Sequence, residues 1–262
     1  MEQKLDSNFL NKRQRYYSNI NIQFQLLDSM RNREVIFMDR NNPANCIRGL
    51  WLKSIPYLKQ AFNYFRFFKK DYNIYISVAK YSHIPMFTYN LSERREEMTS
   101  WRNGEYKQYL IDYSFLFDFD EHKFISDGTE RGRKTVFNRS KMIEELFFIM
   151  DRLKKTGIKH YIVPSGKNFH IVGQNILADR TKPEEIKKLI IAMKENYNLE
   201  YLDLSGCGHH FKIMKCPYSL VGETCVFPLD KFHIENISDY NYFDANNILE
   251  REYVAFRGLI WH

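Results

Sequence analysis

Cysteine, proline and glycine are scarce in this sequence of 262 residues, which has 4 Cys, 7 Pro and 11 Gly. So few glycines and prolines exclude long flexible linkers and low-complexity tracts. The cysteines (Cys46, Cys207, Cys216 and Cys225) are not arranged like the framework of a small secreted disulfide protein. We therefore expect reduced thiols and a reducing compartment.

Long apolar runs are also missing. No stretch reaches the length that a membrane-spanning helix requires. The opening residues, MEQKLDSNFLNKRQR, are charged throughout and contain no apolar core of the kind found in a secretory signal. We expect a cytoplasmic protein that has no membrane partner.

What the chain does have is aromatic residues and positive charge. Hydrophobic residues make up 44% of it and aromatic residues 16%, which is enough for the core of one large domain. The 39 Lys and Arg outnumber the 32 Asp and Glu and give a net charge of +7. This balance favours a polyanionic partner such as nucleic acid.

The spacing of apolar residues predicts an α+β fold with a mostly antiparallel sheet flanked by helices. Helical spacing is found at 6–32, 42–70, 140–155, 181–197 and 246–257. Strands are predicted at 33–38, 71–80, 85–91, 108–120, 160–164, 168–173, 200–204, 211–214 and 225–229. The charged segment 93–107 and the polar segment 121–138 are predicted to be loops.

The strand predicted at 108–120, QYLIDYSFLFDFD, has the most informative pattern. Its odd positions are aromatic or aliphatic, and its even positions end in Asp118 and Asp120. Two carboxylates that close repel each other unless a cation lies between them, and hard oxygen ligands suit Mg²⁺ or Mn²⁺. Pairs of such ions handle phosphates in many polymerases and nucleases. On this strand alone, a solvated end whose acids discourage aggregation is the stronger explanation.

Three later stretches supply further candidates. SGKNFHIVG brings the Ser165 hydroxyl, the Lys167 ammonium and the His170 imidazole to one turn, an arrangement that suits a triphosphate. LEYLDLSG places Asp203 at the end of a short apolar strand, where it would complete a three-carboxylate metal site. KCPYSLVGETCVFPLD offers Lys215 to a phosphate. Taken singly, each stretch is also explained as an ordinary hairpin or turn.

The order of these motifs resembles the archaeo-eukaryotic primase superfamily, which comprises replicative primase subunits and primase-polymerases. The matching segments, in chain order, are REVIF (33–37), ISVAKYSHIP (76–85), FDFD (117–120), SGKNFH (165–170), LD (202–203) and KCPYSL (215–220). They extend over roughly residues 30–235. The ordered set is far more specific than any single piece of it.

The resemblance implies a single catalytic domain from 1 to 262. Its parts would be an N-terminal α/β module at about 1–107, an RRM-like catalytic module at about 108–235 and a C-terminal helix at 236–262. The active site would lie in the cleft between the two modules.

The resemblance also implies a DNA primase or DNA polymerase, a nucleotidyltransferase that makes or extends primers on a single-stranded DNA template. Asp118, Asp120 and Asp203 would be its catalytic residues and would bind two Mg²⁺ or Mn²⁺ ions. A primer 3′-hydroxyl would attack the α-phosphate of an NTP or dNTP. The nucleotide would be bound by Ser165, His170 and Lys215, with Arg33 near the site and Lys167 at the same turn as Ser165.

The chain differs from replicative primase subunits in three respects, one of which is an interval from Ser165 to His170 that is closer to plasmid and viral primase-polymerases. Val221 stands where replicative primase subunits often have a histidine, and the segment 121–138 has no cysteine for a zinc stem. These departures favour a stand-alone or accessory primase-polymerase from a plasmid, virus or other mobile element, or from a CRISPR-linked system. Such an enzyme would act in DNA replication beside a helicase or an accessory replication or CRISPR protein.

A structural Zn²⁺ site is a separate hypothesis. The possible ligands are Cys207, His209, His210, Cys216 and Cys225, although their spacing matches no standard zinc knuckle. Contact of His209 or His210 with template or nucleotide, and ordinary packing of these side chains, are alternatives.

Two other functions are compatible with the residues. A two-metal nuclease would use the same carboxylates, although it needs no triphosphate pocket. A catalytically silent module that binds single-stranded nucleic acid would stack bases on exposed aromatics, although an acidic cluster would repel the phosphate backbone.

Overall fold

The computed structural model describes residues 7–88, 90–126, 133–165, 168–222 and 224–229. The helices are α1 (Ser7–Ser18), α2 (Ile20–Ser29), α3 (Ile55–Tyr64), α4 (Leu91–Ser100), the π-turn η1 (Trp101–Glu105), α5 (Tyr106–Tyr109), α6 (Arg139–Lys155) and α7 (Pro183–Asn196). The first strands are β1 (Val35–Asp39), β2 (Cys46–Leu50), β3 (Tyr72–Ser77), β4 (Ala79–Tyr81), β5 (Leu110–Tyr113), β6 (Phe115–Phe119), β7 (His122–Ser126) and β8 (Arg133–Phe137). The remaining strands are β9 (His160–Pro164), β10 (Phe169–Gly173), β11 (Leu202–Asp203), β12 (Ile213–Lys215), β13 (Leu220–Val221) and β14 (Thr224–Cys225). None of the helices in these ranges is long and apolar enough to cross a bilayer.

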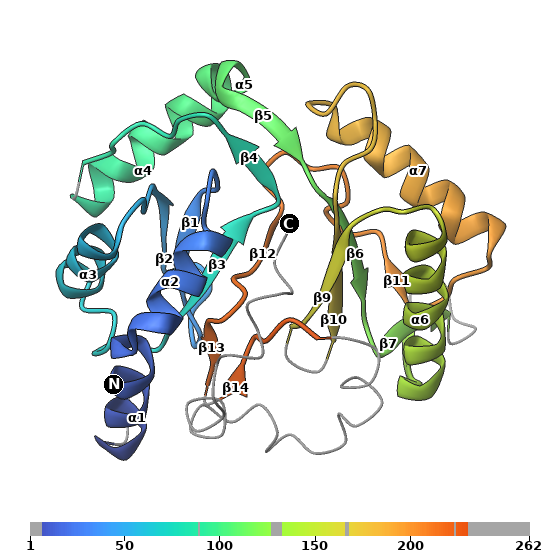
Figure 1. Ribbon diagram of the computed structural model, residues 1–262, viewed down its shortest axis with the longest axis horizontal. Helices are drawn as coiled ribbons and strands as arrows, with labels where there is room; N and C mark the ends of the chain where they lie inside the picture. The colour runs from blue at the N-terminus through green and yellow to red at the C-terminus, as the bar shows by residue number, and fades with distance from the viewer. Residues whose placement is uncertain (1–6, 89, 127–132, 166–167, 223, 230–262) are drawn as a thin grey trace.

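Two four-stranded sheets form the centre of the molecule (Figure 1). Their strand orders are β12-β3-β1-β2 and β11-β6-β10-β9, and every pairing in them is antiparallel. The predicted α+β class with antiparallel sheets is therefore confirmed. The first sheet takes its edge strand β12 from the second half of the chain, so the two sheets are interleaved in sequence.

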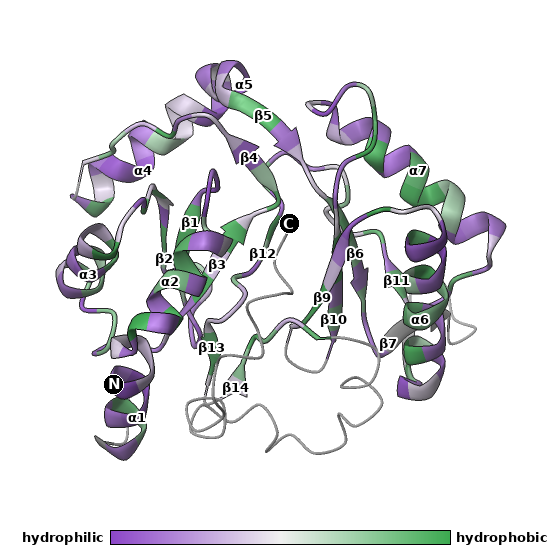
Figure 2. Ribbon diagram, in the orientation of Figure 1, coloured by the Kyte–Doolittle hydropathy of each residue, from purple (hydrophilic) through white to green (hydrophobic). Residues whose placement is uncertain are grey.

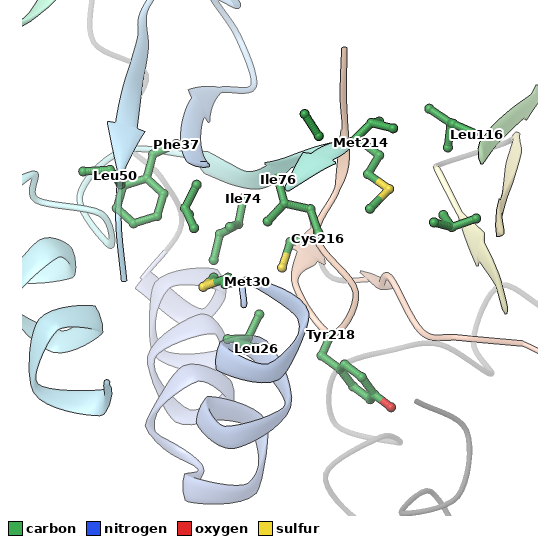
Figure 3. Packing of buried hydrophobic residues seen from close by; sticks show 14 of the residues in the cluster. Leu26, Met30, Phe37, Leu50, Ile74, Ile76, Leu116, Met214, Cys216 and Tyr218 are labelled. Atoms are coloured by element: carbon green, nitrogen blue, oxygen red, sulfur yellow. The ribbon is translucent and has the colours of Figure 1, made fainter. Parts of the chain in front are cut away.

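The helices cover these sheets with one apolar side each. Bands of green and purple alternate along α6 and α7, as expected for amphipathic helices (Figure 2). Both helices lie beside the β11-β6-β10-β9 sheet (Figure 1), and Arg139 of α6 stacks over the ring of Phe169 on β10. Leu26 and Met30 lie beside Ile74 and Ile76 of β3, so α2 and the residue after it cover the other sheet (Figure 3).

The pattern in β6 explains where its aspartate lies. Phe115, Phe117 and Phe119 are almost completely buried, and Phe119 is paired with Phe169 on the side covered by α6. Because side chains alternate along a strand, Asp118 points to the opposite face of this sheet. The strand predicted at 108–120 is in fact two strands, β5 and β6, which belong to different sheets and are separated at Ser114.

The helix predicted at 42–70 is partly wrong. Its first part is β2, where Ile47 and Leu50 pair with β1, and only Ile55–Tyr64 is helical. Their three-residue spacing, interrupted by a bulge in the pairing, imitates one turn of a helix. Pro56 occupies the first turn of α3, where proline favours a helix start, and does not kink a longer helix.

The predictions for 85–91 and 93–107 are also wrong. The first segment does not pair as a strand, because the guanidinium of Arg94 binds the carbonyls of Phe87 and Thr88 at 3.0 and 2.9 Å. The second is α4, η1 and α5 instead of a loop, and Trp101 anchors it in the core.

Three further predictions need adjustment. The helix at 6–32 is divided at Asn19, whose side chain accepts from the N–H groups of Asn21 and Ile22 and caps α2. The loop at 121–138 contains the paired strands β7 and β8. The helix predicted at 246–257 lies outside the described residues. Those at 140–155 and 181–197, and the strands at 160–164 and 168–173, are confirmed within a residue or two.

Candidate active site

Asp118 lies at the centre of a row of polar side chains. It is paired with His170 of β10 on one side and with Asp203 of β11 on the other. Residues paired in this way point to the same face of a sheet, so Asp203, Asp118 and His170 lie next to one another on three strands. Like charges directly opposite each other destabilise a sheet, and the row therefore needs a cation.

Two basic groups contact the Asp118 carboxylate. His170 Nε2 lies 3.1 Å from one oxygen, and Lys212 Nζ lies 3.2 Å from the other. Burial acts to raise the pKa of Asp118, but the hydrogen bond and charge of His170 and the charge of Lys212 outweigh it and lower the pKa. Asp118 is therefore ionised at neutral pH.

His170 has a second ring nitrogen, Nδ1, which is buried. The residue is 7% exposed, and its Nδ1 has no hydrogen-bond partner among the residues that the structure describes. Since Nε2 donates to Asp118, Nδ1 is an acceptor in the neutral ring and a donor only when the ring is doubly protonated. Buried polar atoms are nearly always paired, so this one marks a place where a polar group is expected.

Asp120 follows directly after β6, and Asn168 orients it. The Asn168 side-chain amide donates to the Asp120 carboxylate, while its oxygen accepts from the Glu121 N–H at 3.2 Å. Asn168 was not among the predicted site residues. It lies within SGKNFH, two residues after Gly166, where an asparagine is explained as ordinary turn chemistry.

Asp203 ends β11 and is held by the turn that follows it. Its carboxylate accepts from the Ser205 N–H at 2.9 Å and from the Ser205 hydroxyl. The turn chemistry considered for this residue is thus present, and the same side chain also lies opposite Asp118.

The donor atoms fit a hard divalent cation, although they are not arranged around one. In the described ranges no three His, Cys, Asp or Glu side chains converge closely enough to hold a metal ion. Asp118 and Asp203 do line a cavity of about 10 Å³ together with Lys212. That is about the volume needed for a single water or ion, and its carboxylate oxygens are the ligands that Mg²⁺ and Mn²⁺ prefer.

Lys212 is a site residue that the sequence patterns did not reveal. It precedes β12, and its carbonyl accepts from the Val78 N–H at 2.9 Å. The side chain crosses Gly206, which has a φ of +65° and would place any added Cβ 3.0 Å from Lys212 Cδ. Only the turn and the pairing of distant strands bring this lysine to Asp118, so local spacing does not predict it.

The predicted nucleotide-binding residues lie on several elements, not only on the three strands of this row. Ser165 follows β9, is half-buried, and donates its N–H to the Asn168 carbonyl at 2.8 Å. Lys167 lies outside the described residues. Lys215 lies on β12 opposite Tyr75, and burial, followed by the charge of Arg40, lowers its pKa to about 8.

Arg33 is buried and joins several chain segments. It donates to the carbonyls of Ser77 and Val78, both at 2.7 Å, and to the Ser114 hydroxyl at 3.0 Å. Arg33 also lines a cavity of about 250 Å³ with Lys80 and Tyr161. In this arrangement the guanidinium holds the start of β6 against β3 and β4.

The possible zinc ligands do not form a cluster in the described part of the chain. Cys216 and Cys225 are completely buried, and burial raises the pKa of both thiols, that of Cys225 to about 12. A raised pKa disfavours the thiolate that zinc requires. Both cysteines therefore act as small apolar core residues, and Figure 3 shows Cys216 beside Ile74 and Ile76.

Comparisons with known proteins found similarity to solved structures, but not to family models or curated sequences. No protein-family model matches this sequence, and no curated protein sequence matches it significantly. Among solved structures, the chain is similar to the polymerase domain of Mycobacterium tuberculosis Ligase D in complex with DNA, with a TM-score of 0.56 and 14% sequence identity. The match covers 92% of this chain and 89% of the other. At this identity the similarity shows that the two chains share a fold.

Proposed function

We propose that this protein is a template-dependent nucleotidyltransferase, a primase or polymerase that adds nucleotides to a strand paired with single-stranded DNA. The observation that carries the proposal is the row of Asp203, Asp118 and His170 on adjacent strands. The fold shared with a polymerase domain supports it. Phosphoryl transfer requires charge neutralisation and positioning, and this row offers both.

In this proposal Asp118, Asp120 and Asp203 hold the divalent cations, Mg²⁺ or Mn²⁺. Such ions lower the pKa of the attacking hydroxyl and neutralise the charge of the triphosphate. His170 keeps Asp118 ionised and oriented through Nε2. Asn168 holds Asp120 in place beside this row.

The remaining predicted residues have supporting roles. Ser165 and Lys167 precede His170 in the sequence and are proposed to contact the triphosphate. Lys215 adds a positive charge at the adjoining edge strand, together with Arg40. Arg33 acts by holding the start of β6.

DNA is the proposed partner for two reasons. The net charge of +7 favours a polyanion, and the polymerase domain of similar fold is in complex with DNA. A helicase or accessory protein stays a proposal from the family resemblance alone.

The test is nucleotide addition on a single-stranded template, with and without a primer, in Mg²⁺ or Mn²⁺ and with each nucleotide pool. Asp118→Asn and Asp203→Asn preserve shape and remove one charge each, and we expect each to lower the rate about a hundredfold or more. Asp179→Asn is the matched control, because the Asp179 carboxylate accepts from its surface neighbours Thr181 and Lys182 and lies outside the row.

Several outcomes separate the candidate functions. Products that depend on nucleotide and disappear in both site variants support the proposal. Degradation of the template without nucleotide would indicate a nuclease. Equal DNA binding by all variants, with no product under any metal, would leave a silent binding module.

A further inference from the structure

Lys212 occupies a cation position in the carboxylate row. Its ammonium lies 3.2 Å from Asp118 Oδ2 and 3.0 Å from the Ser205 carbonyl. The hydroxyl and N–H of that same Ser205 bind the Asp203 carboxylate. The positive charge therefore contacts Asp118 directly and lies against the Ser205 turn that holds Asp203, the carboxylate opposite Asp118.

The site is shaped around this side chain. Lys212 is 19% exposed and Asp118 is 16% exposed, so their contact is largely shielded from solvent. Gly206 leaves room for the stem of the lysine, because a Cβ there would lie 3.0 Å from Cδ and 3.5 Å from Nζ. The carbonyl of Lys212 is bonded to Val78, which fixes the origin of the side chain while leaving its end able to move.

The ammonium competes with a divalent ion for the same oxygen. Asp118 has two carboxylate oxygens, and one of them already accepts from His170. The other, Oδ2, is bound by Lys212, and Asp118, Asp203 and Lys212 line the same cavity. A divalent cation close to a fixed ammonium is repelled, and this repulsion is strong in a partly buried site.

We infer that Lys212 is an internal counter-ion that weakens metal binding at Asp118 until a nucleoside triphosphate draws its ammonium away. The inference rests on the proposed function. The triphosphate supplies several negative oxygens, so the ammonium exchanges one anionic partner for another as the metal takes its place. Metal and nucleotide then strengthen each other's binding, and by linkage the coupling is equal in both directions.

The experiment measures Mn²⁺ affinity of the full chain from the electron paramagnetic resonance signal of unbound Mn²⁺. Lys212→Met keeps the apolar stem and removes the charge. Without nucleotide we expect it to bind Mn²⁺ about tenfold more tightly than the wild type. With a nonhydrolysable triphosphate analogue, after correction for Mn²⁺ bound by the analogue itself, the wild type should approach the variant.

Two control variants isolate the cause. Lys212→Arg keeps the charge and should stay within about threefold of the wild type. Lys188→Met removes the same charge from the surface of α7, where Lys188 pairs with Glu185, and should change nothing. Thermal unfolding of each variant confirms that the fold is retained.

Two results would overturn the inference while leaving the proposed function intact. One is equal Mn²⁺ affinity in Lys212→Met and the wild type, with binding lost in Asp118→Asn. The other is a gain in Lys212→Arg as large as in Lys212→Met, because the charge would then not be the cause. Absence of Mn²⁺ binding in every protein, or binding that survives in Asp118→Asn, would overturn both the inference and the metal site.

Discussion

Lys215 illustrates how one residue's surroundings set a testable pH dependence. Burial, followed by the neighbouring charge of Arg40, lowers its pKa from the usual value near 10.5 to about 8. The ammonium is therefore mostly protonated at pH 7 and loses its proton far earlier than an exposed lysine. If Lys215 contacts the triphosphate, nucleotide binding depends on that proton.

We predict that nucleotide affinity falls as pH rises from about 8 to 9.5 in the wild type. Lys215→Arg keeps its charge throughout this range, so its affinity should stay nearly constant. The dissociation constant of a nonhydrolysable nucleotide, measured against pH for both proteins, checks this. An identical decline in both would assign the pH dependence to another group.

The lowered pKa of Lys215 also makes the free energy of unfolding depend on pH. Between the folded pKa of about 8 and the unfolded value the unfolded chain binds more protons, so this lysine's penalty on folding shrinks as pH rises. The penalty is fully present below pH 8.

At the scale of elements, Arg94 determines the shape of a whole segment. The guanidinium, on α4, donates to the carbonyls of Arg48 and Gly49 at 2.7 and 2.8 Å, in addition to those of Phe87 and Thr88. It thereby fastens β2, the segment before α4 and α4 itself into one unit. Arg94 is 5% exposed, so these carbonyls have little water to replace it.

We predict that Arg94→Ala lowers the free energy of unfolding by about 2–4 kcal/mol, because several buried carbonyls lose their donor. Arg95→Ala is the matched control, since Arg95 is exposed on the same helix and should change stability by less than about 0.5 kcal/mol. Urea denaturation of the three proteins measures both effects. Equal stability of the two variants would contradict the structural role of Arg94.

The elements that the sequence predicts well are those stabilised by neighbours along the chain. In α6, Met142, Leu146, Ile149 and Leu153 recur at helical spacing and are all buried, and Asn138 caps the first turn. By contrast, Arg94 looks like one charged residue among many, and nothing local shows that it replaces a strand partner. The strand predicted at 85–91 was wrong for that reason.

The candidate site likewise contains residues that local sequence patterns predict and residues whose place depends on distant parts of the chain. The DxD motif ends an alternating strand, so Asp118 and Asp120 stand out from the pattern alone. Whether Asp203 lies opposite Asp118 depends on a strand register set far away in the sequence. The place of Lys212 depends in addition on a left-handed glycine, which spacing does not reveal.

At the scale of the whole molecule, the two sheets are joined by the order of their strands along the chain and by a shared core. β12 completes the sheet of β1–β3 although it lies after β11 of the other sheet, and Leu229 forms a bridge with Ile162 of β9. The hydrophobic core is one continuous cluster that includes residues of both sheets. Neither sheet is complete without a strand from the other half of the chain.

We predict a single cooperative unfolding transition, because separation of the sheets would remove β12 from β3. Trp51 and Trp101 both belong to the region of the first sheet. The third tryptophan, Trp261, lies outside the described residues, so the fluorescence is measured on the Trp261→Phe variant and then reports on that part. Its midpoint should coincide with that of far-ultraviolet circular dichroism, which reports on both sheets. Midpoints separated by several degrees would show that the sheets unfold independently.

The segment 204–212 connects the two sheets over a fixed distance. One end is Asp203, paired with Asp118 in one sheet, and the other is Lys212, bonded to Val78 beside the other sheet. Insertion of a single residue there would leave both cores packed, yet it would shift the lysine relative to the carboxylate that it neutralises. We therefore expect related chains to keep the length of this segment together with Ser205, Gly206 and Lys212, and to vary its other side chains.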